Sequence, residues 1–163
     1  MKPVHECATV GSGMTAKPDY GIDAPGVIRN LALIGAGLLV LAFATPPVWH
    51  LGQVSLNARW SFVFPGVLCV GEAVLMLAYA KHGKFVHRDR MMRMVDWRGN
   101  EQVLDVGTGR GLLLVAAAAR VPNGRATGID VWNREDLSGN SEERTRKNFE
   151  MEGVADKCEL LSA

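Results

Sequence analysis

The chain has 163 residues, the length of one ordinary domain with an appendage, and 48% of them are hydrophobic. Its formal net charge of +1 creates no overall basic field, so the charge balance does not indicate a nucleic-acid partner. The three cysteines and four histidines are scattered rather than spaced as metal ligands, which argues against a metal site and favours a reducing compartment.

Glycine and proline recur through residues 1–26, and no helical or strand period runs through them. Such a segment gains little from burial and has no regular hydrogen-bonding pattern to follow. It is predicted to be a flexible leader.

Two apolar blocks follow the leader. Residues 27–49 are apolar apart from Arg29, Asn30 and Thr45, and the block is long enough to cross a hydrocarbon core of about 30 Å. Residues 62–80 are interrupted only by Pro65, Gly66, Gly71 and Glu72. The link over 50–61 is short and nearly uncharged, so the pattern predicts a transmembrane helical hairpin over 27–80.

Two other interpretations compete with the hairpin. The first block could be a signal peptide with a cleavage site near Ala42-Phe-Ala44, although the long leader and the second block argue against it. Both blocks could instead be buried helices, but a small soluble domain has little surface with which to cover them. Because an ionised carboxylate in lipid is costly, Glu72 is expected to face the hairpin interior.

Basic residues cluster directly after the hairpin. Six lie between Lys81 and Arg98, against two acids, whereas the link between the helices has only Arg59. The positive-inside rule therefore predicts a protein of the inner (cytoplasmic) membrane with both chain ends in the cytoplasm. Residues 81–96 are predicted to be a basic juxtamembrane helix, which could lie on the anionic leaflet, pack on the following domain, or do both.

Residues 97–163 have the pattern of an α/β domain. Strands are predicted at 101–106, 125–131 and 157–162, with helices at 112–120 and 140–152, where Asn140 and Glu143 suit a capping pair. The order strand, helix, strand, helix, strand is the first half of a Rossmann-like doubly wound sheet. The fold class is thus α/β, preceded by a two-helix transmembrane hairpin.

A glycine-spaced turn joins the first predicted strand to the first helix of this domain. Gly107, Gly109 and Gly111 allow a tight turn and a close approach to a ligand. Asp105 stands at the end of the strand before the turn, and Asp130 ends the next strand, as in nucleotide-type sites. The dinucleotide fingerprint requires glycine or alanine at position 112, where this chain has leucine.

The run Val-Leu-Asp-Val-Gly-Thr-Gly-Arg-Gly, residues 103–111, resembles the first motif of class I S-adenosylmethionine-dependent methyltransferases. Thr127-Gly-Ile-Asp130 and Asn148 before Gly153-Val154 extend the likeness over 97–163. The hairpin before Trp97-Arg-Gly resembles, more generally, bacterial membrane-anchored members of that family.

The resemblance implies S-adenosylmethionine as cofactor and assigns roles to the matching residues. The turn would pass beneath the methionine part and the ribose, Asp105 would hold the methionine ammonium, and Asp130 would accept from the ribose hydroxyls. Val131 and Trp132 would lie against the adenine. Structural roles are the alternatives: a turn cap for Asp105, a helix N-cap for Asp130 and a core position for Trp132. The implied cofactor-binding residues are Asp105, Gly107, Thr108, Gly109, Gly111, Asp130, Val131 and Trp132.

The family pattern continues beyond the third strand, with a further acidic residue, more strands and the loop that touches the methyl acceptor. Since the chain ends at Ala163, we expect a truncated form that lacks the acceptor site, and no catalytic residue can be assigned. A hydrophobic or lipid-like acceptor would suit the membrane anchor. An NAD(P)-dependent oxidoreductase fragment and a non-catalytic membrane interaction protein are the alternative functions.

Overall fold

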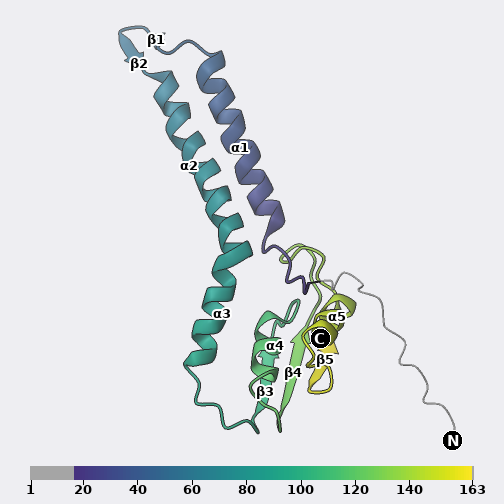
Figure 1. Cartoon of the computed structure of the whole chain (residues 1–163). Coiled ribbons are helices and arrows are strands. Elements are labelled where there is room, and N and C mark those ends of the chain that lie inside the picture. The colour runs from purple at the N-terminus through teal and green to yellow at the C-terminus, as the bar shows by residue number, and fades with distance from the viewer. Residues whose placement is uncertain (1–16, 163) are drawn as a thin grey trace, which may run out of the picture.

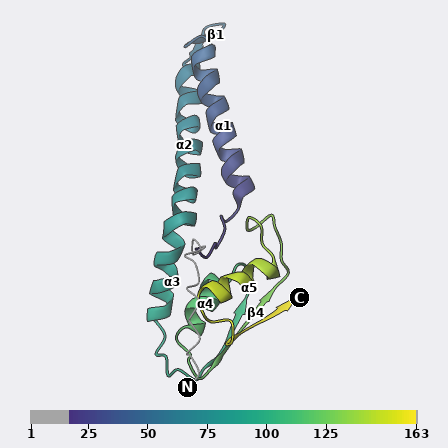
Figure 2. The same cartoon turned by 45° about the vertical axis from the view of Figure 1, so that its right-hand side comes forward.

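A computed structural model describes residues 17–162 of the chain. Two long helices form a hairpin that stands away from a small α/β unit, as both views show (Figures 1 and 2). The elements, in chain order, are α1 (Pro25–Ala44), β1 (Trp49–Leu51), β2 (Val54–Leu56), α2 (Ala58–Ala78), the π-helical turn η1 (Tyr79–Gly83), α3 (Lys84–Arg93), β3 (Gln102–Val106), α4 (Leu112–Ala118), β4 (Arg125–Asp130), α5 (Glu142–Met151) and β5 (Cys158–Ser162).

Helices α1 and α2 are both long and apolar enough to cross a membrane, and their most apolar windows are only 11% buried. The large apolar side chains therefore point outward, which is not the arrangement of core helices in a soluble domain. Glu72 is also exposed on α2, so the expectation that it faces the hairpin interior was wrong. Only small residues are buried on the two helices: Gly35, Ala42, Ala58, Gly66 and Ala73.

The helix ends differ from the predicted ranges of 27–49 and 62–80. Helix α1 stops at Ala44 because Thr45 precedes the Pro46-Pro47 pair and takes an extended ψ of 156°. Trp49 begins a short antiparallel ribbon, β1–β2, which occupies the link. Helix α2 begins at Ala58, since the Asn57 side chain caps it by accepting from the Trp60 N–H at 3.3 Å.

The two helices approach closely at Gly35. A Cβ placed there would lie 2.8 Å from the Gly66 carbonyl oxygen and 2.7 Å from Val70 Cγ2. Gly35→Leu is therefore expected to force the helices apart and destabilise the hairpin by about 1–3 kcal/mol, the usual penalty of overpacking. The measurement is thermal unfolding of the full chain in detergent micelles, followed by circular dichroism.

Gly37→Leu is the matched control, because a Cβ at Gly37, in the same helix, would meet no atom within 4 Å in the described part of the chain. Its unfolding midpoint is expected to stay at that of the parent chain. Equal losses in the two variants would show that the effect comes from the lost glycine itself and not from the contact between helices.

Residues 58–93 form one 36-residue helix, in which α3 continues the axis of α2 through the π-helical turn (Figure 1). The basic segment predicted at 81–96 therefore extends from the hairpin instead of lying across its end, and its helix stops at Arg93. Near its far end, Met92 packs with Ala116 and Ala117 of α4. Helix α3 thus connects the hairpin to the α/β unit.

The α/β unit contains a parallel sheet in the order β3-β4-β5, with Asp105 paired in register with Gly128 and Asp130 with Ser162. Leu114 of α4, Phe149 of α5 and Leu160 of β5 belong to one buried cluster, so the two helices cover one face of the sheet. On the other face Leu104, Val106 and Leu161 are 60%, 75% and 45% exposed, so within residues 17–162 nothing covers it. The predicted order of strands and helices is confirmed, with ends displaced by one or two residues.

Residues 17–24 lie against the α/β unit and are named the strap below. Residues 1–16 of the predicted flexible leader lie outside the described residues, and Pro25 and Gly26 already belong to α1. The strap is irregular but packed, and Tyr20 is 6% exposed within it. Its packing depends on polar partners far away in the sequence, which the glycine and proline pattern did not reveal.

Candidate functional site

The glycine turn between β3 and α4 has the backbone conformation that its sequence requires. Gly107, Gly109 and Gly111 have φ angles of +75°, +53° and +81°, a region that residues with a Cβ rarely adopt. The N–H groups of Gly107 and Thr108 both donate to the Ile129 carbonyl, at 2.7 and 3.1 Å. The turn is therefore held against the end of β4.

A Cβ would find different surroundings at Gly111 and at Gly107. A Cβ at Gly111 would lie 2.7 Å from Phe149 Cε1, so helix α4 can begin there only because glycine allows α5 to pack closely. A Cβ at Gly107 would meet no atom of residues 17–162 within 4 Å. The turn therefore presents bare backbone to open space, where a ligand could approach it.

Asp105 lies beside the turn, and its carboxylate accepts a hydrogen bond from the Thr108 hydroxyl at 3.0 Å. Burial raises the pKa of Asp105, and the charge of Asp130 raises it further, whereas the bond from Thr108 lowers it. The carboxyl group thus caps the turn and also lines the cavity in front of it. A cationic ligand group in that cavity would be paired with a carboxylate that is poorly solvated.

Asp130 joins the end of β4 to the glycine turn. One carboxylate oxygen accepts from the Gly109 N–H at 2.7 Å, and the other accepts from the Trp132 N–H at 2.6 Å and the Asn140 side-chain amide at 3.1 Å. Asp130 is 8% exposed, and no helix follows it directly, so it is not the N-cap considered above.

Asn140 has a different role from the one predicted. Its side chain turns inward to Asp130, and Ser141 caps α5 by accepting from the Arg144 N–H at 3.4 Å.

Val131 and Trp132 are less closely connected to the turn. Val131 is 70% exposed, while the Trp132 indole N–H donates to the Ser162 hydroxyl at the end of β5, at 2.9 Å. The Trp132 ring packs against the core of the unit, and its backbone has a φ of +57°. The structure thus brings together Asp105, Gly107, Thr108, Gly109, Gly111 and Asp130, whereas the Trp132 side chain extends to β5 and that of Val131 is exposed.

A cavity of about 180 Å³ lies in front of the turn. It is lined by Asp105, by the turn itself and by residues from three other segments: Tyr20 and Asp23 of the strap, Lys84 of α3 and Leu137. Leu137 Cδ2 would lie 3.0 Å from a Cβ at Gly109, so the loop before α5 covers that end of the turn. None of these four residues belongs to a motif, and only their tertiary packing brings them to the site.

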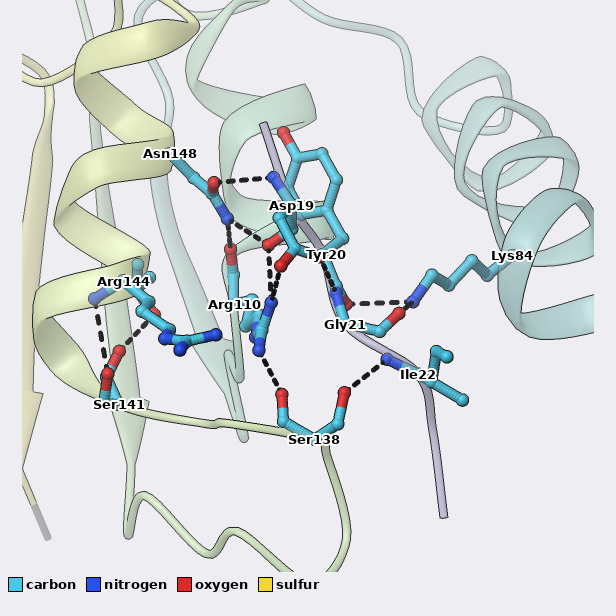
Figure 3. A network of polar contacts seen from close by, with 11 residues as sticks. Asp19, Tyr20, Gly21, Ile22, Lys84, Arg110, Ser138, Ser141, Arg144 and Asn148 are labelled. Carbon is cyan, nitrogen blue, oxygen red and sulfur yellow. Dashed lines mark hydrogen bonds and ion pairs between the residues drawn. The ribbon is translucent and has the colours of Figure 1, made fainter. Parts of the chain in front are cut away.

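Arg110, between two of the glycines, attaches the strap to the turn (Figure 3). Its guanidinium pairs with the Asp19 carboxylate at 2.5 Å and donates to the carbonyl oxygens of Asp19, at 3.2 Å, and Ser138. Burial opposes ionisation of Asp19, but the Gly21 amide and Arg110 together hold the pKa of its carboxyl below the ordinary value. Asn148 of α5 donates to the Asp19 and Arg110 carbonyls.

Lys84 holds the strap from the opposite side (Figure 3). It is 8% exposed, donates to the carbonyl oxygens of Tyr20 and Gly21 at 2.9 and 2.6 Å, and pairs with Asp23 at 3.5 Å. Burial, together with a 2.8 Å hydrogen bond to Glu152, raises the pKa of the Tyr20 hydroxyl well above its usual value. The strap therefore connects the start of α1 to α3, the turn and α5.

Asp105→Asn is expected to stabilise the fold at neutral pH. Since the folded state raises the pKa of Asp105, folding favours its protonated form, and this contribution to stability is lost as the pH rises through the raised pKa. Removing the buried charge should raise Tm by about 2–4 °C, the effect of roughly 1 kcal/mol in a chain of this size. The measurement is thermal unfolding at about pH 7 and at about pH 4. The gain in Tm should be smaller at about pH 4.

Asp156→Asn is the control for this prediction, because Asp156 is exposed. Its midpoint should follow that of the parent chain at both pH values. A lower midpoint for Asp105→Asn at neutral pH would mean that the ionised carboxylate stabilises the turn, contrary to the argument from burial.

The chain matches no known protein-family model, and a comparison with curated proteins finds no match. Among residues 17–162, no group of three or more His, Cys, Asp or Glu side chains could hold a metal ion.

Proposed function

We propose that the chain is a membrane-anchored protein whose α/β unit binds S-adenosylmethionine in the manner of class I methyltransferases. One observation carries the proposal: two carboxylates at the ends of adjacent parallel strands lie on either side of a turn whose three glycines all have positive φ. The bond from the Gly109 N–H to Asp130 ties these parts into one site. Ligands of open parallel sheets bind at this edge, outside the carboxyl ends of the strands.

The residues fit the methionine end of this cofactor. Asp105 offers a carboxylate to its ammonium group, and the open space over Gly107 admits a ligand against the backbone. The bound cofactor would supply an electrophilic methyl group on its sulfonium, and these residues would hold and orient it.

The ribose end of the cofactor fits only after a local movement of the loop that carries Leu137. A cavity of about 180 Å³ is below the size of pockets that enclose whole cofactors, roughly 300 Å³ or more. Leu137 would therefore have to move off Gly109, and the ribose hydroxyls would have to use the remaining acceptor capacity of Asp130. Because the open form of this loop is rarely populated, a ligand that binds only to that form has a lower apparent affinity.

The direct test is calorimetry of the full chain in detergent micelles, titrated with S-adenosylmethionine and separately with NAD⁺ and NADP⁺. We expect saturable binding of S-adenosylmethionine with a Kd in the range of about 1 μM to 1 mM, and none of the nicotinamide cofactors. Leu112 stands where the dinucleotide fingerprint requires a small residue, which supports this preference. Binding of NAD⁺ alone would overturn the proposal in favour of the oxidoreductase alternative.

The proposal places α1 and α2 across the cytoplasmic membrane with both chain ends in the cytoplasm. The outward-facing apolar side chains of the hairpin support insertion, and the basic residues after α2 support this orientation. The test labels single cysteines, in a background without the native ones, with an impermeant maleimide. Ser55→Cys in the link should react in intact spheroplasts, whereas Asp156→Cys should react only after lysis; the reverse result would invert the topology.

A non-catalytic interaction role is the second candidate. It is favoured by the uncovered sheet face with Leu104, Val106 and Leu161, because parallel sheets are ordinarily covered on both faces. If calorimetry detects no S-adenosylmethionine binding while Leu104→Glu changes the sedimentation of the purified chain, this second function replaces the first.

A further inference from the structure

A second, larger cavity lies where the hairpin joins the α/β unit. Its volume is about 410 Å³, within the range of small-molecule sites. The strap forms one wall through Tyr20 and Ile22, and the continuation of α2 forms the other through Ala80, Lys81, Lys84 and Phe85. The rings of Tyr20 and Phe85 meet edge to face, with their centroids 5.9 Å apart.

If the hairpin crosses the membrane as proposed, this cavity lies at the level of the lipid headgroups. The strap ends at residue 24, directly before α1 begins at Pro25, and Lys81 follows the end of α2 by three residues. Tyr79, at the same level, is 49% exposed, as suits an interfacial ring. A cavity here would open beside the phosphate and glycerol groups of the lipids.

The charges that line the cavity favour an anion. Two lysines line it against one acid, Asp19, and that acid is already paired with Arg110. Lys84 is engaged by the strap carbonyls and Asp23, whereas Lys81 is exposed and takes part in no ion pair within residues 17–162. Lys81 is therefore the cation available to a ligand.

We propose that this cavity binds the glycerophosphate headgroup of an anionic phospholipid, with the phosphate on Lys81 and the acyl chains along the exposed apolar surface of the hairpin. The apolar wall of Ile22, Ala80 and Phe85 suits the glycerol backbone and the first carbons of the chains. The inference rests on the proposed membrane insertion and does not depend on S-adenosylmethionine. Because Tyr20 and Lys84 also line the smaller cavity at the glycine turn, the lipid would lie next to that site.

The test reconstitutes the full chain, without any nucleotide cofactor, in phosphatidylcholine nanodiscs that carry a trace of spin-labelled phosphatidylglycerol or spin-labelled phosphatidylcholine. The ratio of their association constants, from electron paramagnetic resonance, measures the preference for the anionic lipid. Lys81→Gln should lower this ratio about fivefold or more, the contribution of one basic side chain at the membrane surface, and Lys81→Arg should restore it.

Arg90→Gln is the matched control. Arg90 is exposed on α3 but lies about 13 Å further along the helix axis, beyond the Debye length of about 8 Å, and it does not line the cavity. The ratio of the two association constants should be the same for Arg90→Gln as for the parent chain. Equal losses for Arg90→Gln and Lys81→Gln, or no loss for Lys81→Gln, would overturn the lipid site.

Competition with soluble glycerol 1-phosphate tests whether the cavity binds a lipid or a free phosphate anion. It should leave the bound fraction of spin-labelled phosphatidylglycerol unchanged, because it has no acyl chains to hold it against the hairpin. Displacement at millimolar concentration would assign the cavity to a soluble phosphate and overturn the lipid proposal. No step of this experiment involves S-adenosylmethionine. A negative result for the lipid site therefore does not affect the cofactor proposal, and a negative result for cofactor binding does not affect the lipid site.

Discussion

Replacing Asp130 by alanine is expected to lower the free energy of unfolding by about 3–5 kcal/mol and to abolish binding of S-adenosylmethionine. Its buried carboxylate accepts from two backbone N–H groups, those of Gly109 and Trp132, and from the Asn140 amide. All three donors would lose their partner in one step. Urea unfolding of the full chain in detergent measures the first effect, and calorimetry the second.

Asp130→Asn separates binding from folding. The amide keeps the shape of the side chain but removes the charge and one acceptor oxygen, so it should fold while binding S-adenosylmethionine at least about tenfold more weakly, a loss of roughly 1.4 kcal/mol. Glu135→Ala is the control, since Glu135 is an exposed acid of the loop that follows β4, and it should change neither quantity. A folded Asp130→Asn chain with undiminished affinity would remove Asp130 from the cofactor site.

Arg110→Ala is expected to release the strap from the glycine turn. The variant loses a buried ion pair with Asp19 and the bonds to the Asp19 and Ser138 carbonyls, which should destabilise the strap by about 3 kcal/mol. Amide exchange over residues 17–24 should then quicken by about a hundredfold, as measured by hydrogen–deuterium exchange with mass spectrometry.

Arg146→Ala is the control for the loss of an arginine. Arg146 is exposed and pairs with Glu142 one turn away on α5, an interaction worth a few tenths of a kcal/mol. Its variant should leave strap exchange unchanged, and Arg110→Lys should fall between the two because a point charge cannot reproduce the fork of bonds. Unchanged exchange in Arg110→Ala would show that Lys84 and Asn148 hold the strap without it.

Local patterns in the sequence were sufficient for much of this molecule. The apolar blocks, the order of strands and helices in residues 97–162 and a tight turn at the three glycines were all predicted from periodicity and from the absence of a Cβ. The ends of α1 and α2 were less well predicted, since the Pro46-Pro47 pair and the Asn57 cap act over one or two residues. Glu72 was misplaced because its expected partner-facing position depended on how the two helices rotate about their axes.

The candidate site also consists of residues that the sequence revealed and residues that only the structure revealed. Asp105 and Asp130 could be found from the sequence, because each stands at the end of an apolar strand and parallel strands end at one edge of a sheet. The strap, Lys84, Leu137 and the inward turn of Asn140 could not be found, because their partners lie ten or more residues away in the sequence. A glycine- and proline-rich segment looks the same in sequence whether or not such partners exist.

By itself, then, the sequence of this protein determined which segments are apolar, which form helices or strands, and where the chain can turn tightly, since these properties depend on neighbouring residues. Only the tertiary structure decided that residues 17–24 close over the glycine turn and that a lysine-lined cavity lies at the base of the hairpin. The physical reason is that buried polar groups must be satisfied, and Arg110 and Lys84 find their carbonyl partners only when the strap is folded against them.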